Sequence, residues 1–193
     1  MKKPGLLIII AGPSGVGKGT IRKKVMENKK LNLVFSISLT TRKKRVGEKN
    51  GADYFFVTKQ KFLNAIKNND LLEYNNYVGN YYGTSKKQVN QVRKAGKNVI
   101  LEIDVNGAKN VAKAFKKNEI LSFFIVPPSL KELEKRIRGR STETDVTIKK
   151  RLAKAKEEMK LKNKFNYIIV NDTPERASQE IINIIKNATA LRG

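Results

Sequence analysis

Residues 6–20 read Leu6-Leu-Ile-Ile-Ile-Ala-Gly-Pro-Ser-Gly-Val-Gly-Lys-Gly-Thr20, and this stretch decides the fold class. The five aliphatic residues at its start predict a strand that is buried on both faces, as in a parallel sheet. A glycine-rich turn follows at residues 12–20, and Ile21 and Val25 then begin a helical period. A strand, a glycine-rich loop and a helix in this order are typical of a loop whose backbone amides bind phosphate groups.

The loop itself indicates a nucleoside triphosphate. Its glycines allow backbone N–H groups to converge on phosphate oxygens, and the start of the following helix adds positive potential. Lys18 is placed to hold the β- and γ-phosphates, and the Thr20 hydroxyl to bind Mg²⁺. The Walker pattern has Ser or Thr directly after the lysine, whereas Gly19 stands there, an ending that resembles nucleoside monophosphate kinases. We expect ATP to contact Gly12, Pro13, Ser14, Gly15, Val16, Gly17, Lys18, Gly19 and Thr20.

Four further apolar runs predict core strands, at residues 32–38, 98–104, 120–126 and 167–170. An aromatic-rich stretch at 71–82 predicts a strand and a turn. Helical patterns alternate with these strands, and such alternation is the mark of a parallel sheet. We therefore expect an α/β fold of the P-loop NTPase type, with a parallel sheet core and helices on both faces.

Capping patterns mark three of the helices. The patterns are Ser85 with Gln88, Ser129 with Glu132, and Thr173 before Pro174. The first two predict capping boxes, in which the serine and the side chain three residues later bind each other's backbone N–H groups. The third predicts the start of the last helix. Apolar residues at helical spacing predict a short helix at Phe62, Leu63 and Ile66, an apolar face formed by Leu130, Leu133 and Ile137, and a last helix that carries Ala177, Ile181 and Ile185.

Composition limits the function classes. The 193 residues fit one compact domain. Cysteine and histidine are both absent, which excludes disulfides, thiolate metal sites and the commonest general base. The longest aliphatic run is too short to cross a bilayer. Lys2 and Lys3 before this run resemble the start of a signal peptide, but a glycine-rich loop follows the run instead of a cleavage site. We expect a cytoplasmic protein without a membrane partner.

The charge is extreme, with 41 Lys and Arg residues against 17 Asp and Glu residues and a formal net charge of +24. One interpretation is a nucleic-acid binder. The other is an ordinary protein with solvated basic faces. Because the lysines are spread along the chain and form no dense tract, we favour the second interpretation and expect no specific nucleic-acid partner. Anionic nucleotides gain from the positive field in either case.

An ordered set of short motifs runs through the rest of the chain. They are Ser36-Ile-Ser-Leu-Thr-Thr-Arg-Lys-Lys-Arg45, Gly47-Glu48, Gly51, Asp53-Tyr-Phe-Phe-Val57, Asn80-Tyr-Tyr-Gly-Thr84, Leu101-Glu-Ile-Asp-Val-Asn-Gly107, Pro127-Pro-Ser129, Arg140 to Glu143, and Asn171-Asp172. Together with the phosphate loop, this set resembles the guanylate kinase family over residues 4–186. Two polar, arginine-bearing stretches fit the predicted core poorly, at about 36–86 and 129–150. We interpret them as excursions from a single domain, the first an NMP-binding region and the second a lid.

The resemblance implies that GMP is the phosphoryl acceptor. It places GMP against Ser38, Arg42, Arg45, Tyr54, Glu73, Tyr82 and Thr84. The residue types agree, because two arginines three residues apart suit a phosphate dianion. A carboxylate at Glu73 accepts from guanine N1–H and N2–H₂ together, whereas adenine presents a lone pair at N1. The Thr84 hydroxyl is expected beside it.

The resemblance also assigns the transfer chemistry. Its implied catalytic residues are Lys18, Arg136, Arg140 and Arg151, with the arginines folding over the transferring phosphoryl group. Glu102 and Asp104 end a buried strand, where an acid holds Mg²⁺ through water or reaches GMP, and their roles are not separated. Asn171 is expected to contact ATP near the adenine, with Asp172 beside it. Ser141 stands where relatives usually carry glycine, which concerns the local turn.

The predicted function is therefore ATP:GMP phosphotransfer in purine nucleotide metabolism, with Mg²⁺ and with GMP or dGMP as acceptor, in a monomer or homodimer. Phosphoryl transfer proceeds through a loose transition state and needs positioning and charge rather than a covalent nucleophile. Two alternatives stay open. One is a non-catalytic interaction module of the same family, which the intact Lys18 and Thr20 disfavour. The other is a nucleoside monophosphate kinase of different base specificity, which Glu73 disfavours.

Overall fold

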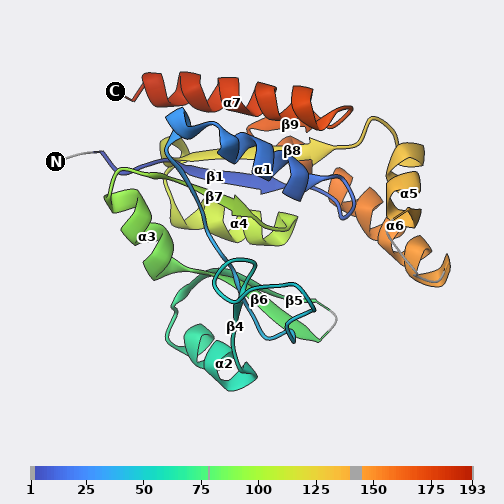
Figure 1. Cartoon of the computed structure of the whole chain (residues 1–193), viewed down its shortest axis with the longest axis horizontal. Coiled ribbons are helices and arrows are strands. Elements are labelled where there is room, and N and C mark those ends of the chain that lie inside the picture. Colours follow the sequence, from blue (N-terminus) through green and yellow to red (C-terminus); the bar gives the residue numbers. More distant parts are fainter. Residues whose placement is uncertain (1–2, 78, 140–144, 193) are drawn as a thin grey trace. The chain divides into compact units, whose positions relative to one another are not determined.

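The computed structural model describes residues 3–77, 79–139 and 145–192 and contains a five-stranded sheet (Figure 1). Its strands are ordered β2 (Leu33–Phe35), β7 (Asn98–Glu102), β1 (Leu7–Ala11), β8 (Ile120–Val126) and β9 (Tyr167–Val170). β8 and β9 pair in parallel. Val99 N bonds to Leu6 O and Ile103 N to Ile10 O, so both strands advance by four residues in the same direction, as parallel strands do. The predicted α/β fold, a parallel sheet flanked by helices, is confirmed.

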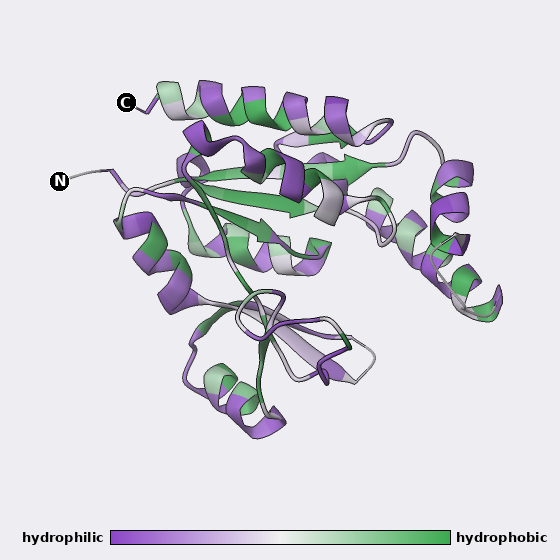
Figure 2. Cartoon of the chain, in the orientation of Figure 1, coloured by the Kyte–Doolittle hydropathy of each residue, from purple (hydrophilic) through white to green (hydrophobic). Residues whose placement is uncertain are grey.

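The central strands are mainly apolar, as Figure 2 shows by their green colour. Every residue of β1 is fully buried, which is the environment that its unbroken aliphatic run predicts. β2 is shorter than the predicted strand at 32–38, because the chain changes sheets there. Ser36 N still bonds to Ile100 O of β7, but Ser38 O accepts from Phe55 N of a second sheet.

Helices α1 (Lys18–Glu27) and α7 (Pro174–Ala190) lie side by side (Figure 1). The predicted apolar faces of both are buried, through Ile21 and Val25 on α1 and Ile181 and Ile185 on α7. The Thr173 side chain accepts from Arg176 N and caps α7 as predicted. Lys24 of α1 and Glu175 of α7 form an ion pair at 2.8 Å.

Helices α5 (Leu130–Arg138) and α6 (Asp145–Met159) follow β8. On the predicted apolar face Leu133 and Ile137 are buried, but Leu130 is 42% exposed because it is the first residue of the helix and extends beyond the core. The Ser129 side chain accepts from Glu132 N at 3.1 Å, which is one half of the predicted capping box. The Glu132 carboxylate accepts from Arg136 Nε at 3.0 Å instead of returning to the cap, since a guanidinium four residues on is a stronger partner.

A second sheet has four strands in the order β4 (Phe55–Phe56), β3 (Leu39–Thr40), β6 (Asn80–Ser85) and β5 (Leu71–Tyr77). β5 and β6 form an antiparallel hairpin in which Glu73 is opposite Thr84. Helix α2 (Lys59–Lys67) connects β4 to β5 and buries Phe62, whose ring stacks on Tyr81 at 5.3 Å. Every element of this sheet lies within residues 36–86.

The remaining helices are α3 (Lys86–Lys94) and α4 (Val105–Ala114), with three-residue turns η1 (Lys29–Leu31), η2 (Lys117–Glu119) and η3 (Lys162–Lys164). Ser85 caps α3 by accepting from Gln88 N at 3.4 Å. Helix α4 corresponds to no element predicted from the sequence. In the described part of the chain, no helix is long and apolar enough to cross a membrane.

By its internal contacts the chain divides into two compact units. Unit 1 comprises residues 1–7, 34–101 and 106–120, and unit 2 comprises residues 8–33, 102–105 and 121–193. In unit 1, the buried Arg93 donates to Gly5 O at 2.8 Å and to Glu119 at 2.7 Å, and its guanidinium lies 4.7 Å from the centre of the Phe115 ring. One side chain thus joins three sequence-distant segments of that unit.

We predict that replacement of Phe62 by Ala destabilises the protein by about 3–5 kcal/mol, because it leaves a cavity beside Tyr81 in a small core. Leu63, the next residue on the same helix, is 37% exposed and supplies the control. Leu63→Ala is expected to cost about 1 kcal/mol or less. Urea unfolding of both variants measures the difference. Equal losses would mean that the Phe62 side chain is not the packing centre of α2.

Candidate active site

The glycine-rich loop has backbone angles that only glycine adopts easily. Gly12, Gly15 and Gly17 have φ angles of 143°, 88° and 96°, in the region that side chains disfavour. At Gly12 a Cβ atom would also lie 2.4 Å from the carbonyl oxygen of Ile125 on β8. The loop is therefore pressed against the neighbouring strand before α1 begins.

Lys18 lies across this loop. Its Nζ donates to Gly12 O at 2.7 Å and to Pro13 O at 3.0 Å. The ammonium group is thereby held above the turn that the sequence predicts to carry phosphates. An ammonium group above a glycine-rich turn at the start of a helix suits the oxygens of a triphosphate.

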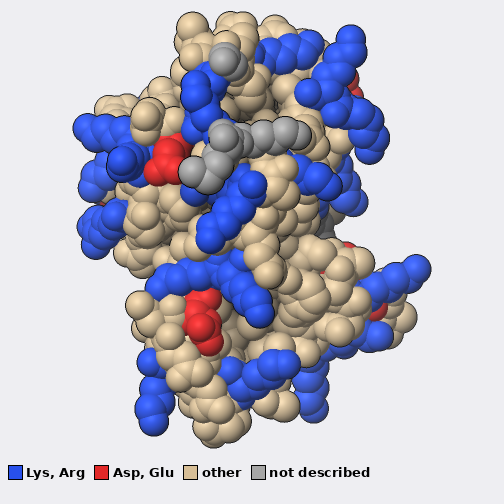
Figure 3. All heavy atoms as spheres, turned by 90° about the vertical axis from the view of Figure 1, so that its left-hand side faces the viewer, with Lys and Arg blue, Asp and Glu red and all other residues tan. Residues whose placement is uncertain are grey.

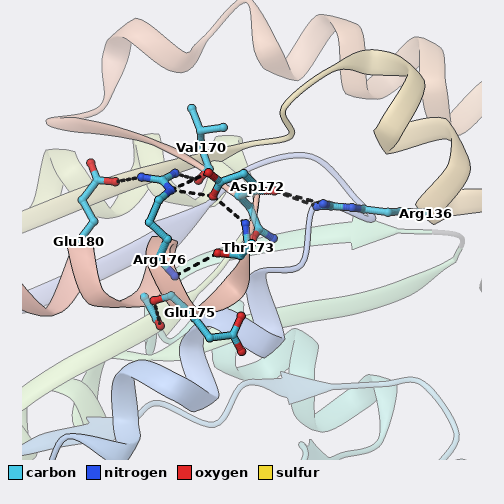
Figure 4. Close-up of polar contacts among 9 residues, drawn as sticks. Arg136, Val170, Asp172, Thr173, Glu175, Arg176 and Glu180 are labelled. Atoms are coloured by element: carbon cyan, nitrogen blue, oxygen red, sulfur yellow. Dashed lines mark hydrogen bonds and ion pairs between the residues drawn. The ribbon is translucent and has the colours of Figure 1, made fainter.

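Two predicted arginines belong to the same unit as the loop. Arg151 on α6 donates from Nη2 to the Ser14 Oγ at 2.8 Å, which brings α6 to the phosphate loop. Arg136 on α5 donates to Asn171 O at 3.2 Å from both terminal nitrogens (Figure 4). Arg140 lies outside the described residues, so its placement is not part of this geometry.

Asn171 supports the loop from the other side. It is 2% exposed, and its Nδ2 donates to Val16 O at 2.7 Å. A Cβ atom on Gly17 would lie 2.5 Å from that Nδ2, so the amide fills the space that the glycine leaves. Its Oδ1 is buried without a hydrogen-bond partner. The predicted contact of Asn171 with ATP stays a prediction, and its contact with the loop is an additional structural role.

The segment after Asn171 is held by a network of charges. Asp172 accepts from Arg176 Nε on both carboxylate oxygens at 2.7 Å (Figure 4). Arg176 also donates to Glu180 at 2.9 Å and to Val170 O. The guanidinium of Arg176 holds the pKa of Asp172 below its usual value. Asp172 therefore stays ionised and fixes the turn between β9 and α7.

The two acids after β7 have different surroundings. Glu102 forms an ion pair with Arg22 of α1 at 2.9 Å, and both side chains are largely covered. A Cβ atom on Gly19 would touch its carboxylate at 3.7 Å, so Glu102 also packs under the end of the loop. Asp104 lies two residues further on, and its negative charge contributes to a raised pKa of Glu158.

The described residues contain no group of three or more Asp, Glu, His or Cys side chains that could hold a metal. Mg²⁺ keeps several waters and usually takes one or two protein oxygens together with phosphates. The exposed Thr20 in the first turn of α1 and the half-buried Asp104 offer a hydroxyl and a carboxylate of this kind. These residues fit a magnesium ion that is bound mainly by nucleotide.

Glu158 on α6 is a carboxylate that the sequence analysis did not single out. Burial raises its pKa above the ordinary value, against the opposing charges of Lys154 and Lys18. Its neighbour Met159 packs against the cluster of Val105, Phe124 and Val126. No motif signals this residue in the sequence, because acids next to lysines are common on exposed helix faces.

In unit 1 the predicted acceptor arginine Arg42 is tightly held. Its Nη2 pairs with Glu48 at 2.6 Å and its Nη1 donates to Lys43 O at 2.8 Å. The guanidinium lies 5.5 Å from the ring centre of Tyr54 and 5.7 Å from that of Phe56. The carboxylate of Glu48 raises the pKa of Arg42, so the arginine keeps its charge.

Three other predicted acceptor residues, Tyr54, Tyr82 and Arg45, lie near Arg42 or its partner Glu48. The rings of Tyr54 and Tyr82 meet edge to face at 5.9 Å. Arg45 is exposed, and its backbone N–H donates to Glu48 at 2.8 Å. Ser38 is half-buried at the crossing into the second sheet.

Glu73 and Thr84 form a buried pair on the β5–β6 hairpin. They are 7% and 1% exposed, and the Thr84 hydroxyl donates to Glu73 Oε1 at 2.5 Å. A carboxylate can accept several hydrogen bonds, so this one bond alone does not saturate it. The sequence predicted the two residues as neighbours, and the cross-strand register brings them together.

Comparison with known proteins decides the family. The family model for guanylate kinase matches residues 5–188. The chain belongs to the guanylate kinase family. A guanylate kinase from Mesoplasma florum is 51% identical over 96% of this chain and 62% of its own length. One from Mycoplasma capricolum is 49% identical over 95% of this chain and 61% of its own length. The chain thus spans less than two thirds of these two relatives.

A solved guanylate kinase structure supports the same assignment. The crystal structure of guanylate kinase from Anaplasma phagocytophilum superposes with a TM-score of 0.78 at 32% identity, covering 96% of this chain and 87% of that one. Membership of the guanylate kinase family and the predicted fold class are thereby confirmed.

The contacts of Glu48 were not predicted from the sequence. Glu48 could have been noticed there, because it is the sole acid between residues 41 and 52.

We predict that Glu158→Gln stabilises the protein near neutral pH. Because burial raises the folded-state pKa of Glu158, its ionised form is less favourable in the folded than in the unfolded protein. The gain should shrink as the pH falls through that raised value and vanish near about pH 4, where both states are protonated. Thermal unfolding across pH measures it.

The control is Glu157→Gln, since the neighbouring Glu157 side chain is 70% exposed and pairs with Lys160. This variant should melt close to the wild type at every pH. A lower melting temperature for Glu158→Gln at neutral pH would show that attraction by Lys18 and Lys154 outweighs the burial.

Proposed function

We propose that this protein is an active guanylate kinase that transfers the γ-phosphoryl group of ATP to GMP. The observation that carries the proposal is the buried Glu73 carboxylate with Thr84 beside it. Guanine presents N1–H and N2–H₂ as adjacent donors, which one carboxylate can accept together. An adenine there would set its N1 lone pair against a buried negative charge, which is costly.

The acceptor phosphate is assigned to the arginines of unit 1. Arg42 and Arg45 supply the opposite charge, and the hydroxyls of Ser38, Tyr54 and Tyr82 supply further donors. Arg42 is the best prepared of these, because Glu48 and two aromatic rings restrict its side chain. A side chain that is already ordered loses less entropy when it binds.

The donor phosphates are assigned to the loop of residues 12–20. Its N–H groups and Lys18 hold the β- and γ-phosphates, while Arg151, which lies at Ser14, joins Arg136 and Arg140 in neutralising charge on the transferring group. Thr20 and Asp104 would hold Mg²⁺, which supplies further charge neutralisation between the phosphates when bound. Asn171 is assigned to the adenine side of ATP.

The reaction needs no covalent intermediate. An oxygen of the GMP phosphate attacks the γ-phosphorus, the bond to the β-bridging oxygen breaks, and ADP and GDP result. Since the γ-phosphoryl group could equally pass to water, the lid at about 129–150 and the NMP-binding region at about 36–86 are assigned the exclusion of water.

Two other functions are less well supported. A non-catalytic module of this family has no need for a lysine bonded across a glycine-rich loop. A nucleic-acid binder would use the net charge of +24. The basic side chains on the face drawn in Figure 3 are spread out, with acidic groups between them, which does not favour this function. We place the protein in the cytoplasm, acting on ATP with GMP or dGMP as monomer or homodimer.

We predict that Lys18→Ala lowers kcat by about 100-fold or more, because it removes a cation from the transferring phosphates. Lys24→Ala is the matched control, since Lys24 lies on the same helix and pairs with Glu175. It should retain nearly full turnover. A coupled assay for ADP production measures both. Near-normal turnover of Lys18→Ala would contradict the assignment of the phosphate loop.

We predict that Glu73→Gln reduces kcat/KM for GMP by roughly tenfold to over a hundredfold. The amide replaces one acceptor oxygen with a donor, so one contact to guanine N1–H or N2–H₂ is lost. AMP should gain relative to GMP, because its N1 can accept from the new NH₂ group. The KM for ATP should change little. An unchanged ratio of kcat/KM between GMP and AMP would remove Glu73 from the base site.

A further inference from the structure

Glu48 has no place in the chemistry described so far, yet it contacts both arginines of the proposed acceptor-phosphate site. Its Oε1 lies 2.6 Å from Arg42 Nη2, and its Oε2 accepts from the backbone N–H of Arg45 at 2.8 Å. A turn bond from Glu48 N to Arg45 O closes the segment at 3.2 Å. The side chain is 20% exposed and that of Arg42 is 13% exposed, so the pair is partly covered from water.

Charge and packing both hold this arrangement. Arg42 and the Arg45 amide lower the pKa of Glu48, which therefore stays ionised across the neutral range. The rings of Tyr54 and Phe56 restrict the guanidinium of Arg42 from the side. Arg42 donates to Glu48 from Nη2 and to Lys43 O from Nη1. A guanidinium has five N–H donors, so these two bonds leave donors for a phosphate.

We propose that Glu48 is a positioning residue that joins the Arg42 side chain to the Arg45 backbone and so orders the acceptor-phosphate site before GMP binds. The inference rests on the proposed function. One carboxylate fixes two parts of the site at once, which lowers the entropy cost of gripping a phosphate dianion.

The alternative role for Glu48 is a competitor that occupies Arg42 until a phosphate displaces it. The second bond argues against this, because a carboxylate tied to a backbone N–H within a closed turn stays where it is when a phosphate approaches Arg42. The two roles predict opposite effects of neutralising the side chain. A positioning residue strengthens GMP binding, whereas a competitor weakens it.

The test is Glu48→Gln in the full chain, since glutamine keeps the length but cannot accept from both partners with two oxygens. Asp53→Asn is the matched control, because Asp53 accepts from Lys49 N at 2.7 Å in the same loop. We expect Glu48→Gln to raise the KM for GMP by about tenfold, with kcat and the KM for ATP within about twofold of wild type. Asp53→Asn should change none of them by more than about twofold.

Guanosine separates positioning from general damage, because it carries the base without the phosphate. Its inhibition constant should be the same for Glu48→Gln and wild type. Equal KM values for GMP in the variant and wild type, a lower KM in the variant, or weaker guanosine binding would each overturn the inference. A wild-type protein that does not phosphorylate GMP would instead contradict the proposed function.

Discussion

The contact between Gly12 and the carbonyl oxygen of Ile125 is the constraint on which the site depends. A Cβ atom at Gly12 would lie 2.4 Å from that oxygen, so the loop can leave β1 along this path only without a side chain. The close approach directs the turn toward α1 and places Lys18 where its Nζ reaches Gly12 O and Pro13 O. Arg151 and Asn171 then meet the loop through Ser14 and Val16. A loop displaced from β8 would leave these side chains without their partners.

The parts of the fold that depend on local pattern could be predicted from the sequence. Aliphatic runs predicted β1, β8 and β9, and apolar spacing predicted the buried faces of α1 and α7. An excursion from the core near residue 36 was predicted, but the second sheet that it forms was not, because that pairing depends on Phe55 meeting Ser38 across a long loop. Leu130 shares the predicted apolar face with Leu133 and Ile137 but is exposed, because periodicity alone does not show where a helix end leaves the packed region.

The site shows the same division. The pairing of Glu73 with Thr84 could be predicted because the family resemblance places the two residues side by side, and the hairpin register explains why they meet. The ion pair of Arg22 with Glu102 links residues 80 positions apart, and the bond of Arg151 with Ser14 links residues 137 positions apart. Nothing local in the sequence relates such pairs. These contacts depend on the order of the strands in the parallel sheet, which local periodicity does not show.

The bridge from Glu48 to Arg42 and Arg45 also governs how this segment can vary. Three side chains in this segment are exposed, those of Lys43, Lys44 and Val46, so other residue types can replace them at little cost. The number of residues between Arg42 and Glu48 is not open in the same way, since the carboxylate must reach a side chain six positions back and an amide three positions back. Gly47, with a φ of 84°, makes the bend that allows both. Substitutions among the lysines should therefore accumulate freely in evolution, while insertions and deletions in the same few positions should be eliminated.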